Sequence, residues 1–546
     1  MNSELNAQQV MAERATDHGQ SRRWWALAAI CFGLFMALLD VTIVNVALPT
    51  IQNDLNESYS TLEWVLNAYT LVLAVLLVTS SRLGDIFGRK GIFMLGMGVF
   101  TLGSLLCALS GDIRIGSLSH ADILNLSRAF QGLGGSAMIP LSLSLISNTF
   151  HGRERGTAFG IWGGVNGLAV AIGPLLGGVL VSKFNWQSIF YINLPVGVIG
   201  LLVAAWAIAP SRDEHAPRRI DVFGLVTITI AMFCLILALM QGSSKGWSSA
   251  FILTLFIVAG VSLLAFIIGE LRLKHPMVDP RLFRIPSFTG TAITAFTLHG
   301  GLYALLFTLS LYVQNLLGFD ALQAGLRFLP LSLLSFIGAP IAGRLSDKIG
   351  PKWILAVGMV CVCVGTYLMA RLGGASQPQA WTVLLPGFIV AGIGSGMVNP
   401  PMSVIAMGVV EPRKSGMASG TANTCRQTGM AFGIALLGAF LSNRYSSLIS
   451  AKVAALHNAQ LTGAMRREIV SGLQQAGPIP GSLGLTDLGG KANSYAHSPL
   501  FPTLQHAARA AFLSATQDVV VLAGSMLVLG VLAAVLLVRP RDIHGH

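Results

Sequence analysis

One aspartate and one arginine lie inside apolar segments that otherwise contain almost no charge. Asp40 occurs in the run LDVTIVNVALPTI, and Arg128 occurs in the run LNLSRAFQGLGGS. An ionised aspartate in the middle of a membrane costs roughly 2.5–3.5 kcal/mol, so a compensating group is expected. A buried carboxyl can hold or release a proton, and an arginine beside it stays charged throughout. The two residues are therefore candidates for proton chemistry inside the membrane.

The composition indicates a protein that crosses a membrane many times. Of the 546 residues, 53% are hydrophobic and 11% are charged, whereas soluble domains have roughly 25% charged residues. Mean hydropathy is +0.69, and apolar runs long enough to cross about 30 Å of hydrocarbon recur along the chain. The basic residues behind the net charge of +12 form short scattered clusters. A soluble protein is excluded, and no nucleic-acid partner is expected because no basic stripe is present.

About fourteen membrane-spanning helices are predicted from these runs, so the fold class is an all-α polytopic membrane protein. Lys and Arg gather in alternate connections, as at Arg89 and Lys90 or Arg153 and Arg155. This asymmetry places both termini in the cytoplasm and the chain in a plasma membrane or bacterial inner membrane. The expected spans are 24–48, 61–80, 91–110, 122–147, 157–181, 187–209, 221–241, 250–270, 288–315, 322–342, 353–372, 381–407, 415–441 and 517–538.

Two halves of the chain repeat each other. SRLGDIFGRK (81–90) and GRLSDKIGPK (343–352) share five identities without a gap, and GLGGSAMIP (132–140) pairs with GIGSGMVNP (392–400). Parallel repeats of this kind build transporters that alternate between two open states. We expect a cytoplasmic tail (1–23), an N-terminal six-helix bundle (24–210), two inserted membrane helices with cytoplasmic loops (211–287), and a C-terminal six-helix bundle (288–546) that includes a long outside loop (about 442–516) and a cytoplasmic tail (539–546).

The repeated charged segment is expected to be a loop that joins the second and third spans of each half. Its glycines permit a tight turn, its acids can face helix N-termini, and its basic residues can reach carboxylates or lipid phosphates. The loops could lock the halves together in one state, or they could only enforce topology through their positive charge. The residues concerned are Arg82, Asp85, Gly88, Arg89, Arg344, Asp347, Gly350 and Lys352.

The motifs resemble those of the major facilitator superfamily, specifically its fourteen-span drug:proton antiporters. The resemblance rests on LDVTIVNVALPTI, SRLGDIFGRK, LNLSRAFQGLGGS, GIWGGVNGLAVAIGPLLGG and NWQSIFYINLPVG, in that order. The chain departs from the family pattern at Ser81, Ile86, Ala169 and Gln187.

The resemblance implies two pseudo-symmetric six-helix bundles around a central cavity, with the first and fourth spans side by side. At about 1.5 Å per residue, Asp40 and Arg128 would lie roughly 12 and 9 Å below the same surface. A proton-coupling pair is therefore expected. A static pair that orients two helices is the alternative.

The fifth span carries the motif that the family associates with antiport and with sealing the central interface against leak. Its residues are Gly160, Gly173, Pro174, Gly177 and Gly178, although close helix packing alone would also use glycines. Several further polar residues could line the substrate cavity, or could only join one helix to another. They are Asn45, Asn67, Asn166, His299, Asn399, Arg426 and Gln427.

The predicted function is proton-driven antiport that exports amphipathic drugs or toxic organic compounds by alternating access. Asp40 would favour cations. The alternative is a dedicated exporter of one metabolite, siderophore, lipid or amino acid on the same scaffold. No P-loop or cluster of catalytic or metal-binding residues is found in the sequence, so an enzyme is not expected, and neither is a metal or a cofactor beyond the transported proton.

Membrane lipid and a small-molecule substrate are the expected partners, and the chain is expected to function as a monomer. Whether the long outside loop docks onto a periplasmic adaptor protein is left open.

Overall fold

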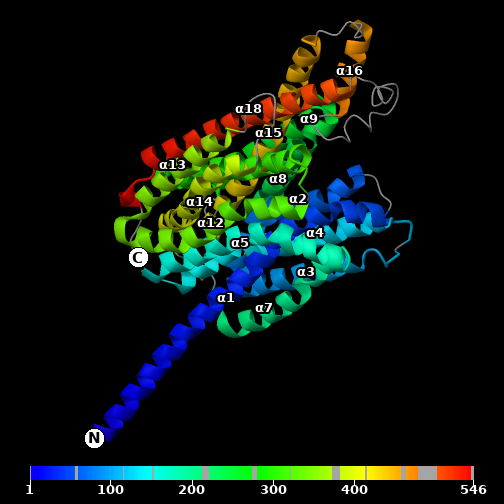
Figure 1. Ribbon diagram of the computed structural model, residues 1–546. Coiled ribbons are helices and arrows are strands. Elements are labelled where there is room, and N and C mark those ends of the chain that lie inside the picture. Colours follow the sequence, from blue (N-terminus) through cyan, green and yellow to red (C-terminus); the bar gives the residue numbers. More distant parts are fainter. Residues whose placement is uncertain are drawn as a thin grey trace.

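The computed structural model is a bundle of long helices (Figure 1). It describes all residues except 1, 56–58, 115, 151–152, 212–220, 274–278, 320, 372–380, 412–414, 457–462, 477–500 and 543–546. The first half contains α1 (Asn2–Leu55), α2 (Tyr59–Phe87), α3 (Arg89–Leu109), α4 (His120–Thr149), α5 (Arg153–Lys183), α6 (Ser188–Tyr191) and α7 (Asn193–Ala207).

The inserted pair is α8 (Val222–Lys245) and α9 (Ala250–Arg272). The second half contains η1 (Pro280–Arg284), α10 (Pro286–Leu298), η2 (His299–Tyr303), α11 (Ala304–Leu311), η3 (Tyr312–Leu316), α12 (Ala321–Ile349), α13 (Pro351–Met369), η4 (Trp381–Leu384), α14 (Leu385–Gly408), α15 (Ser415–Ala454), α16 (Gly463–Ala476), α18 (Phe501–Leu536) and η7 (Pro540–Asp542).

The membrane-spanning character that the sequence predicts is confirmed. Among the described residues, 12 helical stretches are long and apolar enough to cross a membrane. They coincide with all the expected spans except the fifth and the thirteenth, and those two expected ranges lie within α5 and α15. Two expected spans are interrupted: the sixth is divided into α6 and α7, and the ninth contains π-helical turns at His299–Tyr303 and Tyr312–Leu316.

The repeated charged segments are helix ends, so the prediction of loops at 81–90 and 343–352 was wrong. α2 continues to Phe87 and α3 begins at Arg89, so that Gly88 alone turns the chain. Gly88 has φ 110 and Gly350, between α12 and α13, has φ 87. No residue of SRLGDIF stops a helix, whereas a glycine at positive φ does. The tight turns at both glycines are confirmed.

Three helices extend beyond their predicted ends. α15 continues to Ala454 and α18 begins at Phe501, so both flanks of the segment predicted as an outside loop are helical. α1 begins at Asn2, which makes the predicted N-terminal tail helical as well. In Figure 1 the start of α1 projects from one end of the bundle and α16 projects from the opposite end. The glycine- and proline-rich run GPIPGSLGLTDLGGKANS lies outside the described residues.

The two halves contact each other through two pairs of helices. α5 packs along α12, and α2 packs along α15, while α4 and α14 add contacts with the opposite half. The inserted helix α8 contacts both α2 and α15, so it covers one of the seams between the halves. Glycine permits the close approach of α5 to α12, because a Cβ added at Gly160 would lie 2.7 Å from Cα of Pro340.

Hydrogen bonds between the halves cluster at the end of the bundle that carries the Gly88 turn, here called the Gly88 end. Ser419 donates to the carbonyl of Pro140 at 2.6 Å, and the hydroxyls of Ser144 and Ser415 lie 3.0 Å apart. Ser81 donates to the carbonyl of Gly416. These contacts join α2 and α4 to the first turn of α15, so the halves are held together at the Gly88 end.

Candidate functional site

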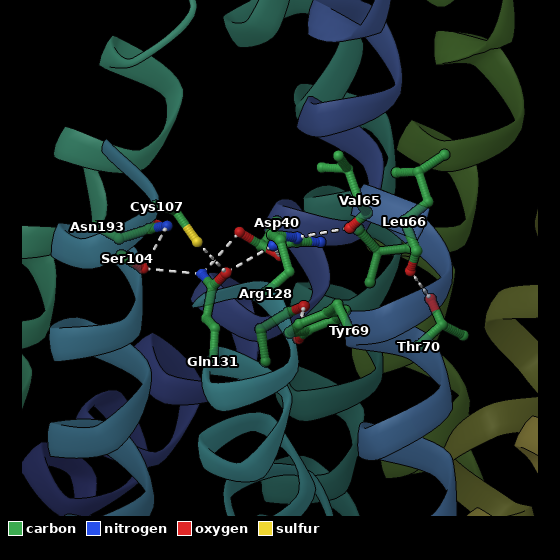
Figure 2. A network of polar contacts seen from close by, with 12 residues as sticks. Asp40, Val65, Leu66, Tyr69, Thr70, Ser104, Cys107, Arg128, Gln131 and Asn193 are labelled. Carbon is green, nitrogen blue, oxygen red and sulfur yellow. Dashed lines mark hydrogen bonds and ion pairs between the residues drawn. The ribbon is translucent and has the colours of Figure 1, made fainter. Parts of the chain in front are cut away.

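Asp40 and Arg128 form a buried ion pair between α1 and α4 (Figure 2). Nη1 of Arg128 contacts Oδ2 of Asp40, and both side chains are 0% exposed. A charge removed from water this completely needs a partner of opposite sign and further hydrogen bonds. The compensating group expected for Asp40 is therefore present.

Gln131 connects this pair to the rest of the N-terminal bundle. Its Nε2 donates to Oδ1 of Asp40 at 2.9 Å and lies 2.8 Å from Oγ of Ser104, while its Oε1 accepts from Arg128 at 2.6 Å. Asn193 on α7 donates to the same Ser104 hydroxyl at 3.2 Å. The sequence analysis missed Gln131, although it lies three residues after Arg128 and so shares its helix face.

The rest of the guanidinium is held by α2 and α6. Nε of Arg128 donates to the carbonyl of Val65 at 2.8 Å. The guanidinium carbon lies 4.4 Å from the centre of the Tyr69 ring and 5.8 Å from that of Phe190. Tyr69 is fixed in turn by donating to the carbonyl of Ala37 at 2.9 Å. All the groups found around this pair belong to the N-terminal half.

Close helix packing brings these side chains within reach of one another. A Cβ added at Gly103 on α3 would lie 2.7 Å from Cα of Gln131, and one added at Gly132 on α4 would lie 2.8 Å from the carbonyl of Tyr69. On α5, a Cβ at Gly173 would overlap the side chain of Thr42, two residues beyond Asp40. The absence of side chains at these positions therefore permits the close helix approach on which the pair depends.

The antiporter-motif residues of α5 face two different neighbours. Gly173 packs against α1 and Gly160 packs against α12 in the other half. Gly177 is buried and Gly178 is half-buried within the same helix. Pro174 also lies in α5, but its side chain lies outside the described residues. α5 therefore contacts both the helix that carries Asp40 and the interface between the halves.

The first repeated segment contains a second buried ion pair, at the Gly88 end. Nη2 of Arg89 lies 2.8 Å from Oδ1 of Asp85, and both side chains are 1% exposed. The Asp85 carboxylate lies against Gly416 in the first turn of α15, where a Cβ would overlap it. A carboxylate at a helix N-terminus is stabilised by the free backbone N–H groups and the helix dipole. Arg82 on the same segment is half-buried.

The second repeated segment is arranged differently. Arg344 is exposed, and Nζ of Lys352 lies 5.5 Å from the centre of the Trp353 ring. The side chain of Asp347 lies outside the described residues. The five identities in the two segments therefore do not give the same contacts for the basic residues in the two halves.

The asparagines and the histidine proposed for the cavity bond mostly within their own helices. Asn45 is exposed and donates to the carbonyl of Val41 at 2.9 Å, and Asn399 is buried and donates to that of Ser395 at 3.2 Å. Nδ1 of His299 lies 2.9 Å from the Ala295 carbonyl oxygen, and its ring stacks on Tyr303 with centroids 4.8 Å apart. Asn67, Asn166 and Gln427 are half-buried.

Arg426 is the proposed cavity residue that lines a pocket. The pocket lies between α10, α14 and α15 of the second half and Leu143 of α4. The Arg426 side chain is 6% exposed, and its guanidinium carbon lies 5.3 Å from the centre of the Trp162 ring on α5. The pocket is lined by Leu143, Phe288, Thr291, Ala292, Ala295, Met402, Ser403, Ala406, Met407, Ala422 and Arg426.

Comparison with known proteins identifies the family to which this architecture belongs. Residues 30–434 match the model of the Major Facilitator Superfamily. The chain is 32% identical over 468 residues to the tetracenomycin C resistance and export protein of Streptomyces glaucescens, covering 84% of both chains. It is 33% identical over 417 residues to the multidrug resistance protein Stp of Mycobacterium tuberculosis (strain CDC 1551 / Oshkosh), covering 76% of this chain and 75% of that one.

Solved structures share the fold at low sequence identity. The human organic anion transporter MFSD10 superimposes with a TM-score of 0.57 at 14% identity, covering 92% of this chain and 99% of that chain. The proton:xylose symporter XylE superimposes with a TM-score of 0.56 at 14% identity, covering 79% and 91%. The paired helical halves, the 12 candidate spans and the family match agree, and the chain belongs to the Major Facilitator Superfamily of membrane transporters.

Proposed function

We propose that the chain is a proton-driven antiporter that exports amphipathic drugs or toxic organic compounds from the cytoplasm. Relatives that cover three quarters or more of the chain bear the names of resistance and export proteins. The observation that supports proton coupling is the Asp40–Arg128 pair, an acid and a fixed cation that are both 0% exposed. No carboxylate other than Asp40 lies within hydrogen-bond distance of Arg128 in the described part of the chain.

The proton acts on this pair by changing the charge of Asp40. When Asp40 is ionised it attracts Arg128 and accepts from Gln131. A protonated Asp40 is neutral and loses most of that attraction, since one charge of the pair is gone. α1 and α4 then lose the strongest contact between them, and a new arrangement of the two helices becomes accessible.

A chain of direct contacts connects this change to the interface between the halves. Thr42, on α1 beside Asp40, packs against Gly173 of α5. The same α5 packs along α12 through Gly160. A movement of α1 would therefore be passed to the helix that forms the largest contact with the other half, which is what a rocking transporter requires.

The Gly88 end is assigned to the cytoplasm, because the basic residues of the connections gather there. With Ser81, Ser144 and Ser419 bonded across the halves, this conformation is closed toward the cytoplasm. Asp85, held by Arg89 against the start of α15, acts as the latch of that closure. Release of Asp85 from α15 would open the cavity to the cytoplasm.

We further propose that the chain is a bacterial inner-membrane exporter that works as a monomer with both termini in the cytoplasm. The projecting helices α15, α16 and α18 are then on the outer side, where a periplasmic adaptor protein could dock (Figure 1). A dedicated exporter of one metabolite, siderophore, lipid or amino acid would use the same machinery. A resistance profile against dyes and drugs, compared with metabolite release, separates the two functions.

Dye efflux from living cells tests the proposed function. Cells that express the chain are loaded with cationic, neutral and anionic fluorescent dyes in turn, and dye loss is followed with and without a protonophore. At least one dye should leave faster than from cells with an empty vector, and the protonophore should abolish the difference. Efflux that continues unchanged with the protonophore would contradict proton coupling, and the absence of faster efflux for every dye would contradict drug export.

A further inference from the structure

Arg426 is a buried cation between the two halves of the bundle. It belongs to α15, its side chain is 6% exposed, and it lies over the ring of Trp162 from the opposite half. Its hydrogen bonds are long: 3.5 Å from Nη1 to Oδ1 of Asn423, and 3.3 Å from Nη2 to Oγ of Ser403. Nε is buried without a hydrogen-bond partner. No carboxylate pairs with Arg426 in the part of the chain that the structure describes.

A buried charge without a counter-ion is costly, and an aromatic ring with two long hydrogen bonds offsets only part of that cost. Arg128 is better compensated, since it has a carboxylate partner in Asp40 and short hydrogen bonds to Gln131 and the carbonyl of Val65, and only its Nη2 is buried without a hydrogen-bond partner. Arg426 has donor capacity left over. An anion next to Arg426 would accept hydrogen bonds from the donors that remain.

The side chains next to Arg426 form an apolar wall, and the space between them is about 10 Å³ in this conformation, so an organic anion would enter only as the surrounding helices separate. The pocket wall is made mainly of Phe288, Ala295, Met402 and Leu143, and its polar members include the hydroxyls of Thr291 and Ser403. A guanidinium binds carboxylates, sulfonates and phosphates through two parallel hydrogen bonds, and it also favours phenolates. The pocket therefore offers one cationic fork beside an apolar wall.

Asp40 does not offset this charge. Both of its oxygens are engaged inside the N-terminal bundle, one by Arg128 and the other by Gln131. No carboxylate is among the described residues that line the pocket, so a cation would find no counter-charge there, whereas an anion would find Arg426. The contacts of Asp40 therefore do not favour the expectation that it selects cations.

We propose that Arg426 is the anion-binding residue of the substrate site, and that the chain exports amphipathic organic anions, with an acidic group on Arg426 and an apolar body against the wall of the adjoining pocket once the helices around it have separated. The inference rests on the proposed export function and names its substrate class. Trp162 comes from the other half and is itself fixed by donating to Oγ of Ser142 at 2.8 Å. Leu143 of the N-terminal half also lines the pocket, so an anion bound there would contact groups from both halves, as a transported substrate must.

Transport of two dyes with the same ring system tests the proposal. Fluorescein is an anion and rhodamine 6G is a cation built on the same xanthene frame. Purified full-length protein is reconstituted in proteoliposomes with an imposed pH gradient, and the initial rates of both dyes are measured. Wild-type protein should transport fluorescein faster than rhodamine 6G. In Arg426→Gln the ratio of the fluorescein rate to the rhodamine 6G rate should fall roughly ten- to a hundredfold, and Arg426→Lys should restore part of it.

Arg327→Gln is the matched control. Arg327 also lies over aromatic rings, at 3.4 Å from the Phe319 centroid and 5.5 Å from that of Trp381, but it does not line the pocket beside Arg426. In Arg327→Gln protein the ratio of the fluorescein rate to the rhodamine 6G rate should equal that of the wild type.

If folded Arg426→Gln protein lost transport of both dyes equally, Arg426 would have a structural role. That result would overturn the inference but would not contradict the proposed export function. Wild-type transport of rhodamine 6G alone would overturn it in the same way. Transport of neither dye would remove the proposed function and the inference together.

Discussion

The two halves of this transporter contain the same kind of buried charge in opposite circumstances. In the N-terminal half, Arg128 is neutralised by Asp40 and enclosed by groups of its own bundle. In the C-terminal half, Arg426 lies between the bundles with no carboxylate partner among the described residues. A charge pair inside one bundle can respond to a proton, whereas an unpaired charge between bundles can bind cargo. In the function that we propose, the two halves share a fold and divide these two tasks.

The same contrast occurs at the Gly88 end. Asp85 and Arg89 form a buried pair against the start of α15, while Arg344 in the corresponding segment is exposed. The N-terminal half therefore supplies the charged pair of the proposed latch, and the C-terminal half supplies the helix terminus that this pair contacts.

Neutralising Asp40 should cause the largest loss of export among these tests. Asp40→Asn keeps the shape of the side chain but can no longer take up and release a proton. Uphill export in proteoliposomes with a pH gradient should fall by at least about a hundredfold, which corresponds to about 2.7 kcal/mol. Asp54→Asn is the control on the same helix, because Asp54 is exposed and accepts from Trp186 at 2.7 Å. Normal uphill export by Asp40→Asn would show that Asp40 does not couple the proton.

Removing the amide that links the pair to its bundle should have the next largest effect. Gln131→Leu fills a similar volume but leaves Oδ1 of Asp40 without its 2.9 Å donor and Arg128 without its 2.6 Å acceptor. A buried group that loses its partner costs about 1–3 kcal/mol. We expect the export rate to fall roughly tenfold and thermal stability to drop. Unchanged export at unchanged stability would mean that the pair functions without Gln131.

A methyl group at the start of α15 should weaken the latch. In Gly416→Ala the new Cβ would overlap the Asp85 carboxylate, and overpacking of this kind costs about 1–3 kcal/mol. Spin labels at Phe87 and Lys348, both exposed at the Gly88 end, should report longer distances as the open conformation gains population. Gly438→Ala is the control on the same helix, because nothing lies within 4 Å of its added Cβ. Identical distance distributions for the two variants would contradict the latch.

The smallest effect is expected for an exposed pair on the projecting helices. Nε of Arg444 lies 2.6 Å from Oδ2 of Asp518, but the side chains are 45% and 40% exposed. Exposed pairs contribute about 0–1 kcal/mol. Arg444→Gln should therefore leave the export rate within about twofold of wild type. A large loss would reveal a function of α15 and α18 outside the membrane.

The spans and the central pair could be predicted from the sequence because each has a strong local signal. Long apolar runs mark the helices, and Asp40 and Arg128 stand out as charges at similar depth in two of them. Gln131 and Asn193 carry no such signal, since a neutral amide in a helix has many ordinary roles. The helix ends were missed because charged residues such as Arg82 and Asp85 continue a helix as readily as they form a loop.

The different surroundings of the two arginines could not be predicted either. Both lie in apolar helices of related halves, and only the packing of α1 against α4, and of α2, α4 and α10 against α15, determines which one meets a carboxylate. Sequence repetition indicates a shared fold, but the contacts of each copy depend on its neighbours.

Proton release on substrate binding tests the central claim most directly. Purified protein in weakly buffered detergent solution is mixed with the dye that it exports most strongly, and released protons are measured with a pH indicator. Wild-type protein should release protons as the dye binds. Asp40→Asn should bind the dye with a similar Kd and release none, whereas Arg426→Gln should bind it weakly. Proton release by Asp40→Asn equal to that of the wild type would contradict the assignment of the proton to Asp40.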